Sequence, residues 1–73
     1  MNTYLYPYFN GEHCSIKKVI ARNFEECQNK IMDYFINSFS NLDDTMDFDD
    51  FVYDLYEKHD IFVGDIFEIN EFL

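Results

Sequence analysis

The chain has only two glycines, one proline, two cysteines and no tryptophan among its 73 residues. The glycines, Gly11 and Gly64, stand far apart, so the sequence holds no glycine-rich phosphate-binding loop. Its three serines lie in no nucleophile-elbow motif. A chain of this size also has little bulk with which to enclose a pocket. We therefore expect a protein that is not an enzyme, with no catalytic residues and no cofactor.

Long apolar runs are missing too, so we expect no membrane span. The first residues lack a basic region followed by an apolar stretch, and we expect no secretory signal. These absences favour a cytoplasmic protein with reduced, unpaired thiols at Cys14 and Cys27. The cysteines and the two histidines fit no zinc spacing. We interpret both cysteines as small buried hydrophobic residues and expect no metal site.

Basic residues are scarce: five Lys and Arg stand against fifteen Asp and Glu, for a net charge of −10. Glu12 is the only acid before residue 23, so nearly all of the negative charge lies in residues 23–73. Nine Phe and six Tyr argue against disorder and supply the core of one domain, residues 1–73. A folded domain of this charge is repelled by nucleic acid and by anionic membranes, and attracted to basic surfaces.

The first 21 residues predict a β-hairpin. Residues 3–9, TYLYPYF, have strand composition and place three tyrosines on one face. Pro7 cannot donate a ladder hydrogen bond, which predicts that this strand lies at the edge of a sheet or is bent at that point. Asn10-Gly11 is typical of a two-residue turn and leads to a second strand from His13 to about Ala21.

This turn sets the expected register, in which Leu5 faces Ile16 and Tyr6 faces Ser15. One face of the hairpin then carries Leu5, Phe9, Cys14, Ile16 and Ile20. The other face carries Tyr4, Tyr6 and Tyr8 with His13, Lys17 and Val19. We expect the tyrosine row to serve in packing.

Two helices follow the hairpin. Asn23 and Glu26 form a capping-box pattern, and apolar residues at helical spacing extend this helix to about Phe39. Asp47 is a favourable N-cap for the second helix, which ends near Asp60 after a basic last turn. The expected apolar stripe of the second helix is Phe48, Phe51, Val52 and Leu55.

After Asp60 the composition is again that of strands, interrupted at Gly64 by a turn or bulge. Either residues 61–63 pair with residues 66–69, or Gly64 bends one strand that joins the hairpin. We favour one C-terminal strand, from about Asp65 to Glu71, added to the hairpin. The expected fold is α+β: a three-stranded antiparallel sheet packed on two helices, in the order β-β-α-α-β.

The most acidic stretch, residues 43–60, holds eight carboxylates and one lysine. Four of these acids recur three or four residues apart, which aligns them on one helix face, and three others extend the line. We call these seven residues the acidic stripe: Asp43, Asp44, Asp47, Asp50, Asp54, Glu57 and Asp60. An EF-hand counted from Asp43 would need Gly at position 48 and Glu at position 54, so the stretch is no designed calcium site.

Two interpretations of the acidic stripe remain open. It is a solvated helix face that keeps the protein soluble, although such faces usually mix both signs. Alternatively, its carboxylates, about 5–6 Å apart along the helix, imitate nucleic-acid phosphates. Tyr53 lies between Asp50 and Asp54, where it either contacts a partner, as tyrosine often does, or covers the thin core.

The helix NFEECQNKIMDYFINSF (23–39) followed by the acidic helix DFDDFVYDL (47–55) resembles phage-encoded anti-CRISPR proteins. Some of these lie in the DNA-recognition groove of an RNA-guided nuclease as DNA mimics. The resemblance is one of pattern and covers about half of the chain. It implies a stoichiometric inhibitor in the cytoplasm of a bacterial host.

The partner that this resemblance implies is a basic nucleic-acid-binding protein, first a CRISPR effector nuclease and second a restriction enzyme or other DNA-binding protein. No direct contact with nucleic acid is expected. From the helix spacing alone, the expected contact residues are the acidic stripe and Tyr53. The alternative is a non-catalytic acidic adaptor that binds a partner through an aromatic patch.

Overall fold

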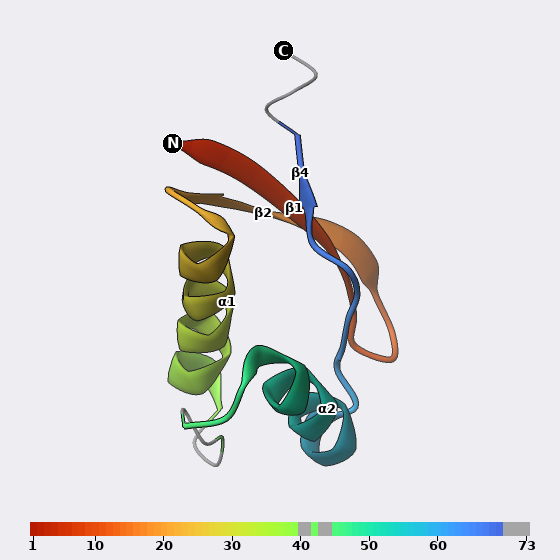
Figure 1. Ribbon diagram of the computed structural model, residues 1–73. Helices are drawn as coiled ribbons and strands as arrows, with labels where there is room; N and C mark the ends of the chain where they lie inside the picture. The colour runs from red at the N-terminus through yellow and green to blue at the C-terminus, as the bar shows by residue number, and fades with distance from the viewer. Residues whose placement is uncertain (40–41, 43–44, 70–73) are drawn as a thin grey trace.

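The computed structural model describes residues 1–39, 42 and 45–69. The elements follow in the order β1 (Asn2–Phe9), β2 (Cys14–Ala21), α1 (Phe24–Ser38), α2 (Phe48–His59), β3 (Phe62–Val63) and β4 (Phe67–Glu68). The predicted α+β class and element order are confirmed, with the C-terminal strand divided in two. Both helices lie on one side of the sheet (Figure 1).

β1 and β2 form the antiparallel hairpin, but its loop is longer than predicted. Leu5 pairs with Lys18 and not with Ile16, so the predicted register is wrong by two residues. The side-chain oxygen of Asn10 accepts hydrogen bonds from the backbone N–H groups of the two residues before β2, at 3.1 and 2.8 Å. These bonds stabilise a four-residue loop, 10–13, in place of a two-residue turn.

A register shift of two residues leaves the side chains of β1 and β2 on their predicted faces, while His13, predicted on the tyrosine face, lies in the loop before β2. Tyr4 and Tyr6 point towards the helices and are buried, and Tyr8 packs against them, which confirms the packing role of the tyrosine row. The opposite face, which we call the outer face, is turned away from both helices. Cys14 lies on the outer face and is exposed, so the expectation that both cysteines are buried holds only for Cys27.

β1 is the central strand of the sheet, and the prediction of an edge strand from Pro7 is wrong. β2 pairs with β1 on one side, and β3 and β4 pair with it on the other. The Pro7 carbonyl accepts a hydrogen bond of 3.0 Å from the Gly64 N–H. The nitrogen of Pro7 therefore faces the side of β1 on which β3 and β4 lie. The N–H group that proline lacks falls at the interruption between these two strands.

The interruption at Gly64 is a β-bulge. Val63 pairs with Tyr8 and Phe67 pairs with Leu5, so three residues of the C-terminal segment face two residues of β1. The two parts pair with β1 and not with each other, so Gly64 bends one strand that joins the hairpin. This strand begins earlier than the predicted Asp65, and its predicted last residues, 70 and 71, lie outside the described part of the chain.

Local capping sets the start of α1. The Asn23 side chain accepts a 2.8 Å hydrogen bond from the Glu26 N–H, as the capping box predicts. The Glu26 carboxylate accepts from the backbone N–H of Arg22, at 3.2 Å, and from its guanidinium, at 2.7 Å. The Glu26 carboxylate therefore accepts from the N–H of Arg22 and not from that of Asn23, one residue closer to the N-terminus than the capping box predicts. The helix spans residues 24–38, within its predicted limits.

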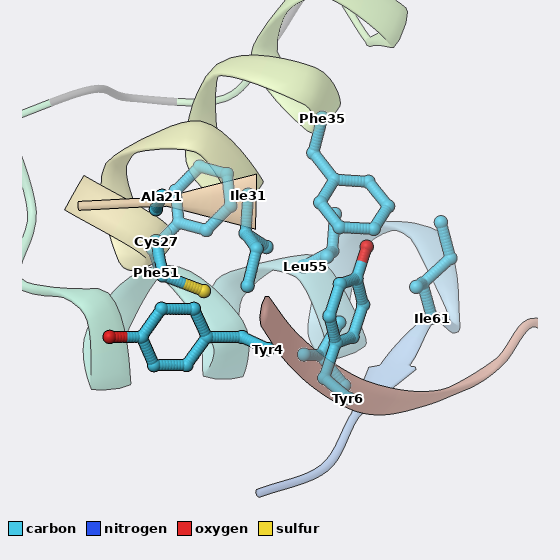
Figure 2. Packing of buried hydrophobic residues seen from close by; sticks show 10 residues of the cluster. Tyr4, Tyr6, Ala21, Cys27, Ile31, Phe35, Phe51, Leu55 and Ile61 are labelled. Carbon is cyan, nitrogen blue, oxygen red and sulfur yellow. The ribbon is translucent and has the colours of Figure 1, made fainter. Parts of the chain in front are cut away.

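The core lies between the tyrosine face of the sheet and the two helices (Figure 2). It is formed by Tyr4, Tyr6, Ala21, Cys27, Ile31, Phe35, Phe51, Leu55, Ile61 and Val63. Burial, with a smaller contribution from nearby Tyr34, raises the pKa of Tyr6 to about 12. Burial also raises the pKa of the Cys27 thiol. Both groups therefore stay neutral and act as core residues.

Candidate partner-binding surface on α2

The orientation of α2 follows from its apolar side. Phe51 and Leu55 are fully buried, and Phe48 and Val52 are half buried against the core, as predicted. Complete burial of each of the first two side chains stabilises the fold by about 1.5–3 kcal/mol. Rotating the helix would expose them, so its polar residues are held on the opposite side, towards solvent.

The structure exposes the acidic stripe unevenly. Asp47, Asp50 and Glu57 are exposed along α2. The Asp54 side chain keeps only 19% of its accessible surface, and its Oδ2 lies 3.2 Å from the Lys58 ammonium. Asp54 is therefore less available to a partner than its three neighbours.

The two ends of the acidic stripe differ in what the structure describes. Asp60 is exposed and ends α2 in the left-handed conformation, with φ 56°. Asp47 stands at the other end of this 12-residue helix, about 20 Å away. Asp43 and Asp44, the expected extension, lie outside the described residues.

Asp47 holds the N-cap position without making the predicted side-chain cap. Its backbone carbonyl accepts from the Phe51 N–H at 2.8 Å, while its side chain makes no capping hydrogen bond. The carboxylate is exposed. Asp47 is thus available to an external cation, which a cap would have hindered.

Tyr53 lies on the exposed side of α2, with 65% of its surface accessible. Its hydroxyl donates a hydrogen bond to the Glu57 carboxylate one turn on, and this bond and the nearby charge raise the pKa of Tyr53. The ring is therefore held along the helix next to the acids. It does not cover the core, and its placement fits a contact residue.

Sequence reasoning missed a hollow beside the acidic stripe, which we call the aromatic hollow. It has a volume of about 450 Å³ and is lined by Asp49, Val52, Tyr53, Tyr56 and Phe62. The spacing of Asp49, Tyr53 and Tyr56 on one helix face could have indicated part of it. Phe62 comes from β3, and only the tertiary fold brings it to α2.

In residues 1–39, 42 and 45–69, no group of three or more His, Cys, Asp or Glu side chains could hold a metal ion. None of the helices in the same part of the chain is long and apolar enough to cross a membrane. Comparison of the chain with protein-family models, with curated proteins and with solved structures gave no match.

Proposed function

We propose that the protein is a stoichiometric inhibitor that acts in the bacterial cytoplasm. Its α2 surface would occupy the nucleic-acid groove of a basic defence nuclease, with a CRISPR effector as the first choice. The main support is the exposure of Asp47, Asp50 and Glu57 opposite the buried side of α2. Carboxylates one helical turn apart, about 5–6 Å, offer a repeated negative charge to a groove that binds phosphates.

The positions of the basic residues also support this proposal. Lys58 is the one lysine of α2, which has no arginine, and it pairs with Asp54. Bases on β2 and α1 contact the fold itself: the Lys17 ammonium lies 5.1 Å from the Tyr8 ring centroid, and the Lys30 ammonium donates to the Ile20 carbonyl at 2.7 Å. This separation of charge would orient the acidic helix towards a basic partner during approach.

The test is a double variant, Asp50→Asn with Glu57→Gln, in competition with DNA for purified CRISPR effector nucleases. Each lost charge-assisted contact is worth about 1.5–3 kcal/mol, so affinity should fall by about two orders of magnitude or more. Asp54 is left unchanged because its ion pair with Lys58 would mix a stability effect with a binding effect.

The matched control is Glu25→Gln with Asp33→Asn on α1, which removes the same charge from two exposed positions. Its affinity should stay within about threefold of the parent, since only long-range attraction is reduced. Equal losses in both double variants would show that net charge alone matters. Undiminished binding by the α2 variant would support the solvated-face interpretation and reject mimicry by this helix.

The aromatic hollow favours a second candidate, a non-catalytic adaptor that binds a partner protein. Tyr53, Tyr56 and Phe62 are each more than half exposed, and aromatic side chains of this kind often anchor protein interfaces. Binding through the hollow should change little with ionic strength and be lost in Tyr56→Ser. Groove binding should weaken steeply as salt is added.

A further inference from the structure

The outer face of the sheet is apolar, although the solvated face of a two-layer antiparallel sheet is normally polar. Ile16, Ile20 and Phe67 are 63%, 49% and 59% exposed. In the observed register, Phe67 lies beside Leu5, and Pro7 lies beside Ile16. Apolar side chains from three adjacent strands thus form one continuous surface.

The centre of this surface is an open hollow of about 580 Å³, lined mainly by Leu5, Pro7, Ile16, Phe67 and Ile69. Monomeric proteins rarely expose a contiguous apolar patch of more than a few hundred Å², and larger patches usually mark an interaction surface. The helices lie on the other side of the sheet and cannot cover it (Figure 1).

The charge of the outer face indicates what covers it. Neither β1 nor β2 contains an Asp or Glu. Lys18 is the one charged residue that these two strands place on the outer face, and β2 is an edge strand, so its ammonium can reach water at the rim. Glu68, from β4, is the one acid among the residues that line the hollow. In a protein of net charge −10, two copies can therefore approach through this face with little repulsion.

We propose that two copies of the chain pack their outer faces against each other across a twofold axis. β1 has eight residues and is about 26 Å long, and three strand positions span about 14 Å. Such a patch covers about 360 Å² on each copy, so the two faces together bury roughly 700 Å², which is below the size of a standard specific interface. The dimer is therefore weak and reversible, with sheets packed face to face.

This dimer leaves α2 on the outside of both copies, because α2 and the outer face lie on opposite sides of the sheet (Figure 1). It does not depend on the proposed function of α2. If that function holds, the dimer presents two acidic surfaces at once. The salt dependence separates the two interactions: dimerisation between acidic copies strengthens with added salt, while binding to a basic groove weakens.

Sedimentation equilibrium over about 1–500 μM protein, at low and high salt, should show a dimer fraction that rises with concentration and with salt. Ile16→Lys would place an ammonium in the apolar contact and weaken dimerisation at least tenfold. The control Tyr34→Lys changes the net charge equally at an exposed position on α1. It should dimerise as the parent does.

Phe67→Lys repeats the test from the opposite edge of the sheet, and thermal melts report which variants fold. Because both positions are exposed, at least one variant should fold as the parent does. A monomer under all conditions, or a folded Ile16→Lys or Phe67→Lys protein that dimerises as well as Tyr34→Lys, overturns the proposal. So does loss of the dimer in Asp50→Asn with Glu57→Gln, which would place the contact on α2.

Discussion

Gly64 and Pro7 meet where the C-terminal strand bends across β1. A Cβ atom on residue 64 would lie 2.4 Å from the Pro7 Cγ and 3.3 Å from its Cδ. The closed proline ring cannot rotate out of the way, so any side chain there would have to displace backbone. Residue 64 must therefore be glycine for the two segments to approach this closely. Gly64 and Pro7, the single proline of the chain, form one structural unit.

Gly64→Ala should lower the free energy of unfolding by about 1–3 kcal/mol through overpacking, as measured by urea denaturation. Pro7→Ala removes the atoms that the new methyl group would meet. In the double variant, the cost of Gly64→Ala should largely disappear, giving a coupling of more than about 0.5 kcal/mol. Additive effects of the two substitutions would show that the clash is not the cause.

The start of α1 depends on one carboxylate with several partners. Glu26 accepts hydrogen bonds from the backbone N–H and the guanidinium of Arg22, and the Lys30 ammonium lies 3.7 Å from it. These contacts, the bond from the Arg22 side chain foremost, lower the pKa of Glu26 from its ordinary value of 4.5. The charged form is therefore the one that stabilises the junction between β2 and α1.

Because the pKa of Glu26 is lower in the folded protein, its contribution to stability is present above about pH 4.5 and is lost as the pH falls through the folded value. Glu26→Gln should therefore lower the melting temperature at pH 7, and the difference from the parent should shrink by about pH 3. Glu25→Gln, in the same helical turn, is the control and should show a smaller difference at pH 7. An equal loss at both pH values would assign the effect to packing.

The elements that could be predicted from the sequence depend on local spacing. The buried side of α2 and the exposure of Asp47, Asp50 and Glu57 follow from the helical period alone. The hairpin register depends on the Asn10 side chain, which can close either a two-residue or a four-residue loop. The amino-acid pattern does not distinguish these outcomes.

Features that join distant segments could not be predicted in the same way. The central position of β1 depends on β3 and β4, which follow about 50 residues later and place their break opposite Pro7. The aromatic hollow likewise needs Phe62 beside α2. Both arrangements depend on which distant segments of the chain lie together in the fold. Neither the periodicity nor the composition of the sequence predicts this.

At the scale of the whole molecule, the excess of negative charge acts over the entire fold. The shortest dimension of the protein is 18 Å, which is less than the Debye length of about 30 Å at 0.01 M salt. At low salt the carboxylates of the two helices therefore repel one another through the molecule. The ion pairs Arg22–Glu26, Lys30–Glu26 and Lys58–Asp54, each between positions four apart, oppose this only weakly, because exposed pairs contribute about 0–1 kcal/mol each.

The melting temperature should therefore rise between about 0.01 M and about 1 M sodium chloride, as the Debye length falls from about 30 Å to about 3 Å. Melts at about 1 μM protein keep the chain monomeric, so that salt-driven dimerisation does not contribute. The variant Asp50→Asn with Glu57→Gln has two fewer like charges on one helix, and it should melt higher than the parent at low salt and respond less to added salt. A parent protein that melts lower as salt is added would mean that its ion pairs outweigh the repulsion. In that case the acidic face of α2 would not lower the stability of the fold, and its charge would need no functional explanation.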